Sequence, residues 1–72
     1  MDVRISGLLY ERSGGRRATV LMTHQVIADD LGSSREVISR VLEDLQARGL
    51  IRLSRGAVEV VDPRALERSA HV

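Results

Sequence analysis

The chain has 72 residues, of which 43% are hydrophobic, and this length supports one small core and no second domain. It contains no cysteine, which excludes disulfides, thiolate zinc sites and cysteine catalysis, and Tyr10 is its only aromatic residue, which excludes the stacking platform of single-stranded nucleic-acid binders. Eleven arginines against ten carboxylates leave a net charge of +1, a balance too even to indicate a nucleic-acid partner by itself, and any such partner is expected to be duplex.

The first part of the chain predicts a helix, a loop and a short strand. The helix runs from residue 3 to about residue 11, and one face of it holds Val3, Ile5, Leu8 and Leu9. The segment Ser13–Arg17 contains paired glycines that break the helical period. It lacks the Lys-Ser/Thr of a nucleotide-binding loop and is interpreted as a linker. Residues 18–21 are partly β-branched, which predicts a short strand that pairs with a later part of the chain.

Two helices joined by a sharp turn are predicted next. Thr23 is a good N-cap for a helix over 24–31, whose apolar face holds Ile27, Ala28 and Leu31. Gly32 is expected to end this helix with a positive φ.

The second of these helices is predicted to have one apolar and one polar face. Ser33 or Ser34 caps it, Ser33 forms a capping box with Glu36, and Gly49 ends the helix just after Arg48. At about 100° per residue, the apolar stripe consists of Val37, Ile38, Val41 and Leu45. The opposite face consists of Arg35, Glu36, Ser39, Arg40 and Glu43, and no small apolar core could satisfy such a set.

The remainder predicts a β-hairpin and a last helix. Residues 50–54 and 57–61 form the two strands around Arg55 and Gly56. Asp62 followed by Pro63 begins a helix that runs to about Ser69.

The spacing of small and apolar residues in the two middle helices is typical of a helix-turn-helix. Counted from His24, Ala28 stands at the fifth place, Gly32 at the ninth and Ile38 at the fifteenth. Ala28 permits a close crossing, Gly32 permits the sharp turn, and Ile38 holds the second helix beneath the crossing. In such units the start of the second helix, here a recognition helix over about 34–48, enters the major groove.

The polar face has the chemistry for base contacts. Arg35 and Arg40 can each donate two hydrogen bonds to guanine O6 and N7, and Glu36 can accept one from cytosine N4. A carboxylate adds no attraction for phosphate, so Glu36 indicates either base contact or capping. The plainer interpretation is that the two arginines are solvated and that Ser39 is a neutral exposed serine.

The sequence closely resembles the DNA-binding domain of the Crp/Fnr family of bacterial transcription regulators. The resemblance rests on Met22–Gln25, Leu31–Glu36, Arg40, Arg48–Ile51 and Asp62–Pro63. It implies a winged helix-turn-helix in which Arg35, Glu36 and Arg40 contact bases, joined in the FNR-like branch by Ser39. By the same resemblance, phosphates are held by Thr23, His24, Gln25 and Ser34.

The resemblance also implies a dimer on an inverted repeat with TGA-containing half-sites, and contact with RNA polymerase at activated promoters. Two departures are Val26, where an acidic residue is common, and Val37, where threonine is common. Family members place an effector domain and a long dimer helix ahead of this unit, so the chain is expected to be an excised domain or a shortened regulator, and a monomer or weak dimer by itself. No cyclic nucleotide, haem or iron–sulfur cofactor can be assigned.

Several other polar residues have two interpretations or none. Arg52 and Arg55 flank the hairpin tip, which is either a solvated turn or a wing that contacts the DNA backbone. His24 has no second ligand nearby in the sequence and is no metal site, and His71 is assigned no role. The adjacent carboxylates Asp29-Asp30 and Glu43-Asp44 point about 100° apart and are interpreted as solvated faces.

The sequence therefore predicts one α+β domain over residues 1–72, a winged helix-turn-helix that binds duplex DNA as a transcription regulator and is not an enzyme. The alternative is a winged helix that binds another protein. No apolar run approaches the roughly 18 residues of a membrane span, and the N-terminus has no signal-peptide pattern, so a cytoplasmic protein is expected.

Overall fold

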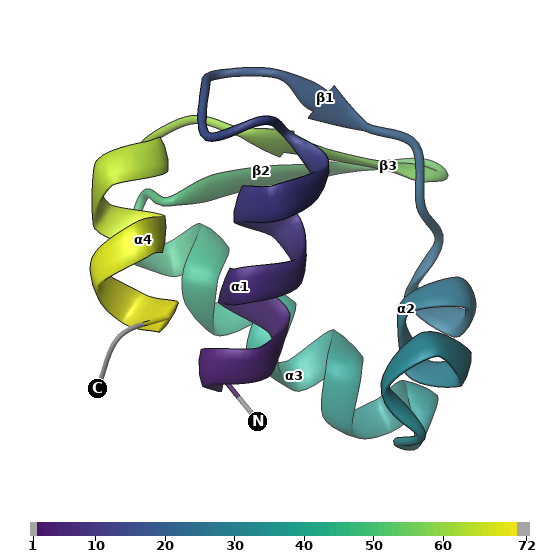
Figure 1. Cartoon of the computed structure of the whole chain (residues 1–72). Helices are drawn as coiled ribbons and strands as arrows, with labels where there is room; N and C mark the ends of the chain where they lie inside the picture. The colour runs from purple at the N-terminus through teal and green to yellow at the C-terminus, as the bar shows by residue number, and fades with distance from the viewer. Residues whose placement is uncertain (1, 71–72) are drawn as a thin grey trace.

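The computed structural model describes residues 2–70, and Figure 1 shows a small sheet lying across one end of a group of helices. The order of elements is the predicted one: helix, strand, helix, helix, hairpin, helix. Their bounds are α1 Asp2–Arg12, β1 Thr19–Val20, α2 His24–Leu31, α3 Arg35–Ala47, β2 Ile51–Ser54, β3 Ala57–Val60 and α4 Pro63–Ala70. Within residues 2–70, no helix combines the length and the hydropathy of a membrane span. Met1, His71 and Val72 lie outside the described residues.

The three strands form an antiparallel sheet in the order β1-β3-β2. The predicted pairing of residues 18–21 with a later segment is confirmed, and the partner is β3, with Val20 opposite Val58. Side chains alternate between the two faces of the sheet, so Val20 and Val58 point into the core while Arg52 and Glu59 lie opposite each other on the outer face. The free edge of β2 is covered in part by α3, because the Leu53 backbone N–H donates to Gln46 Oε1 at 2.7 Å.

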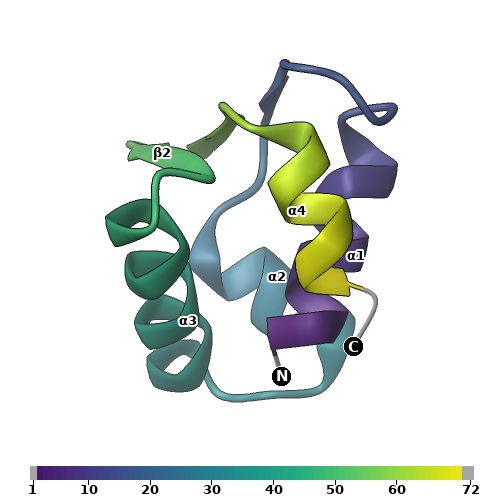
Figure 2. The same cartoon turned by 90° about the vertical axis from the view of Figure 1, so that its left-hand side faces the viewer.

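The core is aliphatic, as the composition predicts, and every helix contributes to it. Helices α1 and α4 pack side by side, as Figures 1 and 2 both show. Tyr10 of α1 lies beside Glu67 of α4, and the hydrogen bond and negative charge of that carboxylate raise the pKa of the Tyr10 phenol. The large side chains buried most completely are Ile5, Leu9, Ile27, Ile38, Leu42, Leu45, Val58, Val60 and Leu66.

Helix α3 is rolled relative to the predicted apolar stripe. Val37 was expected in the stripe but is 39% exposed, whereas Leu42, which the stripe omits, is fully buried together with Ile38 and Leu45. The three buried residues centre near 300° from Arg35 at about 100° per residue, some 40° from the predicted centre. The roll follows from packing, since α3 contacts both α2 and β2 and must turn its apolar side between them.

The turn between α2 and α3 contains one correction. Gly32 has the predicted positive φ, at 64°, but Ser33 belongs to the end of α2, because its backbone N–H donates to the Ala28 carbonyl at 2.9 Å. Ser34 is the N-cap of α3, and its Oγ accepts from the Val37 backbone N–H at 3.3 Å. The predicted capping box of Ser33 with Glu36 is therefore wrong, since Glu36 is only two residues from the cap.

Ser34→Ala is expected to lower the free energy of unfolding by about 0.5 to 2 kcal/mol, because the Val37 N–H loses its acceptor. Ser33→Ala is the matched control and is expected to change it by less than about 0.5 kcal/mol. Urea unfolding followed by circular dichroism measures both. A larger loss in Ser33→Ala than in Ser34→Ala would contradict the cap that the structure shows.

The predicted start of the last helix is confirmed. Asp62 Oδ1 accepts from the Ala65 backbone N–H at 3.1 Å, and Pro63 occupies the first helical position, where no backbone donor is needed. The hairpin also turns where predicted, at Arg55 and Gly56, with Gly56 at a φ of 70°.

Candidate nucleic-acid interface

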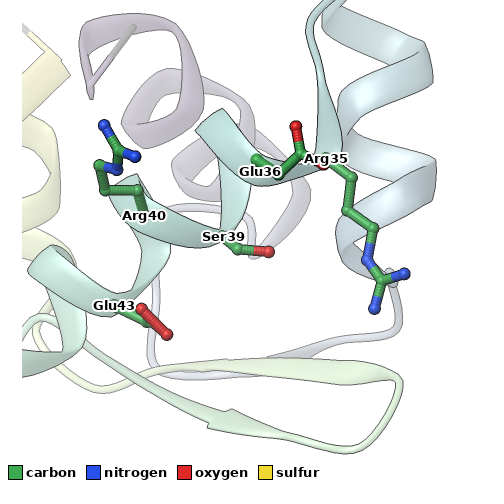
Figure 3. Close-up of a pocket in the computed structure, with 5 residues that line it drawn as sticks. All are labelled: Arg35, Glu36, Ser39, Arg40 and Glu43. Carbon is green, nitrogen blue, oxygen red and sulfur yellow. The ribbon is translucent and has the colours of Figure 1, made fainter.

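The outer face of α3 carries an open hollow of about 340 Å³ lined by Arg35, Glu36, Ser39, Arg40 and Glu43. Figure 2 shows α3 along one side of the molecule, with no other element outside it. All four residues predicted to contact bases therefore share one accessible surface. In Figure 3, Arg35 and Arg40 extend in opposite directions along this face and Ser39 lies between them.

The two arginines of this face form no ion pair within the described part of the chain. Within residues 2–70, the ion pairs join Arg12 to Asp30 at 3.7 Å and Arg48 to Asp44 at 3.4 Å. Neither Arg35 nor Arg40 is neutralised by one of these carboxylates, so both guanidinium groups keep their five donors for an external partner.

Glu43 belongs to this face, although it is not one of the four residues predicted to contact bases. It is exposed, as expected for an acidic residue on a solvated face, but it also lines the hollow one helical turn beyond Ser39. The signal was present in the sequence, because the 100° period places Glu43 on the same face as Arg40 and Ser39. The surface thus combines two arginines with two carboxylates, and it is not the uniformly cationic surface that would bind any anion.

A second hollow, of about 310 Å³, lies beside the first and is formed by three separate parts of the chain. The start of α2, the first residue of α3 and the tip of the hairpin line it: Thr23, His24, Gln25, Arg35, Ser54, Arg55 and Gly56. No carboxylate is among these lining residues. The N-terminus of α2, which is the positive end of its helix dipole, lines the hollow together with Arg35 and Arg55. Arg35 lines both hollows, so the two surfaces are continuous.

The six residues predicted to contact phosphate are not all brought together. Thr23, His24, Gln25 and Arg55 line the second hollow. Arg52 lies instead on the outer face of the sheet opposite Glu59, away from the hairpin tip. Ser34 is exposed between the two helices, next to Arg35 in the chain.

The two capping hydroxyls keep a donor for an external partner. Thr23 Oγ1 accepts from the Val26 backbone N–H at 3.1 Å, and Ser34 Oγ accepts from Val37. Each hydroxyl uses a lone pair in the cap and retains its proton, which a phosphate oxygen can accept. Capping and phosphate binding are therefore compatible at both residues.

One hydrogen bond joins the two hollows. His24 Nδ1 lies 2.8 Å from Ser39 Oγ, which links the first residue of α2 to the middle of α3. The two residues are fifteen positions apart, and neither the helical period nor the helix-turn-helix spacing predicts the contact. Within residues 2–70 there is no group of three His, Cys, Asp or Glu residues that could hold a metal ion.

Comparison with known proteins gives the family. A sequence profile of the Crp-like helix-turn-helix domain matches residues 3–69. The transcriptional regulator LdrP of Thermus thermophilus is 45% identical over 51 residues, which cover 71% of this chain and 26% of that protein.

Solved structures agree with the sequence matches. A CRP/FNR-family transcriptional regulator from Thermus thermophilus has a TM-score of 0.92 at 25% identity, over 100% of this chain and 41% of that one. A crp/fnr-family regulator from Eubacterium rectale has a TM-score of 0.88 at 40% identity, over 100% of this chain and 34% of that one. The chain thus spans less than half of the length of these relatives. They are transcription regulators and not enzymes, and this chain has their winged helix-turn-helix fold. The chain belongs to the Crp/Fnr family of transcription regulators.

Proposed function

We propose that this domain binds duplex DNA in a sequence-specific manner, with α3 in the major groove. The observation that carries the proposal is the unobstructed outer face of α3, where Arg35, Glu36, Ser39 and Arg40 line one hollow. An α-helix fits the major groove, and each good bidentate contact of arginine with guanine discriminates by about 1 to 3 kcal/mol. Glu36 supplies an acceptor for cytosine N4.

The second hollow holds the DNA backbone. Its cationic lining and the start of α2 favour a phosphate, and Thr23, Gln25 and Arg55 offer donors from two different elements. Ser34 donates to the same strand from the turn between the helices. These contacts fix the register of α3 in the groove without selecting a sequence.

The full-length regulator is proposed to be a dimer on an inverted repeat and to contact RNA polymerase. The 72-residue chain by itself is expected to elute as a monomer or weak dimer and to bind a half-site weakly, because the affinity gained by linking two half-sites is absent. A protein-binding winged helix is the less favoured function. Within the described residues, none of the exposed large apolar side chains, Val3, Leu21, Val26 and Val37, lines the hollow on α3.

Titration of labelled duplexes tests the proposed function. Selection from random duplexes should first recover a preferred half-site, and the chain should then bind that half-site more tightly than random DNA at two salt concentrations. Equal affinity for both, or no binding at low salt, would exclude sequence-specific recognition.

Arg55→Ala is expected to weaken binding to all duplexes alike and to reduce the slope of log K against log[salt] by about one, because one phosphate contact is lost. Arg52→Ala is the matched control: it removes the same charge from the same hairpin, but on the outer face of the sheet. Its effect on the slope is expected to be smaller. The same reduction in both variants would show that the hairpin acts only through its total charge.

A further inference from the structure

The hydrogen bond between His24 and Ser39 connects a residue proposed to hold phosphate with one proposed to contact a base. Both side chains are partly buried, and the 2.8 Å distance between Nδ1 and Oγ is that of a strong hydrogen bond. The following inference rests on the proposed function, because it concerns which base Ser39 selects.

The chemistry of a neutral imidazole fixes the direction of this hydrogen bond when DNA is bound. A neutral ring carries one N–H and one acceptor nitrogen. Phosphate oxygens only accept, so a ring that contacts the backbone through Nε2 carries its proton there. Nδ1 is then the acceptor, and Ser39 Oγ–H must donate to it.

Ser39 thereby loses its ability to donate a hydrogen bond to a base, which a free serine has. A serine hydroxyl can donate to or accept from a base edge and by itself selects weakly. Once its proton is committed to His24, Oγ offers only lone pairs to the groove. Adenine N6 and cytosine N4 are the amino donors there, whereas guanine and thymine present acceptors that would meet those lone pairs.

We propose that His24 is a specificity-determining positioning residue, which holds the Ser39 hydroxyl so that it accepts from adenine or cytosine on the contacted strand. In the major groove, every base pair presents one base with an amino donor and one base with a carbonyl acceptor. The preference therefore determines which of the two strands carries the base with the amino group at that position. A single neutral hydrogen bond corresponds to a preference of about three- to tenfold.

Selection from randomised half-site duplexes at about pH 8, a mildly basic pH that favours a neutral imidazole, tests the inference. The wild-type chain is expected to enrich adenine or cytosine at one position. His24→Ala should abolish that preference, leave the preferences due to Arg35 and Arg40 unchanged, and lower affinity several-fold for every duplex because a phosphate contact is lost.

Gln25→Ala is the matched control. Gln25 lines the same hollow, but its side chain donates to Asp29 Oδ1 at 2.9 Å and not to Ser39. Its loss should lower affinity without changing any base preference. If Gln25→Ala erased the same preference, the effect would come from docking of α2 in general, and the inference would be overturned.

Ser39→Ala gives an independent measurement. It should remove the same preference, and His24→Ala should change no base preference in that background. Guanine or thymine at this position in the wild-type selection, or an unchanged preference in His24→Ala, would overturn the inference while leaving the proposed function intact. A wild-type chain with no preference at any position would instead refute the proposed function. Thermal unfolding confirms that each variant is folded.

Discussion

Arg40→Ala is expected to lower affinity for the preferred half-site by about 1 to 3 kcal/mol, or roughly five- to 150-fold, and to relax base choice at one position. The guanidinium stands on the open face of α3, has no ion-pair partner within residues 2–70, and can donate two parallel hydrogen bonds to one guanine. Competition between the half-site and its single-base variants measures both effects.

Arg48→Ala is the control for the loss of one positive charge, because Arg48 caps the C-terminal end of the same helix. Arg48 forms an ion pair with Asp44 and lines neither hollow, so its loss should leave base choice unchanged. An Arg40→Ala variant that lost equal affinity for the half-site and for random duplex would indicate a phosphate contact in place of a base contact.

Ile38→Ala is expected to produce the largest loss of stability. Ile38 is fully buried, belongs to the same core cluster as the fully buried Ala28, and lies on α3, which packs against α2. Truncation of such a side chain costs about 2 to 5 kcal/mol, while a domain of this length has a total stability of about 4 to 11 kcal/mol. Urea unfolding should show a much lower midpoint. If the truncation costs close to 5 kcal/mol, a measurable fraction of the variant should be unfolded even without denaturant.

Val37→Ala is the matched control for this truncation. Val37 is the preceding residue on α3 and is 39% exposed, so its loss should cost less than about 1 kcal/mol. Comparable losses in the two variants would mean that the helix faces the core as the sequence pattern predicts, with Val37 inside.

Local signals in the sequence were sufficient for most of the fold. Thr23 and Asp62 cap the helices they were expected to cap, because an N-cap depends on the residue and the backbone a few positions away. Gly32 and Gly56 adopt the positive φ that their turns require. The outward face of α3 was equally predictable, because the helical period of about 100° per residue places its charged residues together on one side.

Features that depend on distant contacts were not predictable from the same signals. The roll of α3 exposes Val37 and buries Leu42, because α2 and β2 together set the orientation of the helix. The choice of Ser34 over Ser33 depends on how α2 ends. The separation of Arg52 from Arg55 depends on the register of the strands. The contact of His24 with Ser39 depends on how α2 and α3 cross.

The position of β1 in the sheet has a consequence for how far this sequence can be shortened. A peptide beginning at residue 22 would keep both α2 and α3 and the hairpin, yet β3 would lose the strand that covers one of its edges, and Val58 would lose its neighbour Val20. An uncovered central strand invites pairing between copies and aggregation. The smallest autonomous form of this sequence is therefore nearly the whole of it, and a synthetic peptide designed to carry α2, α3 and the hairpin would have to retain the opening helix and strand.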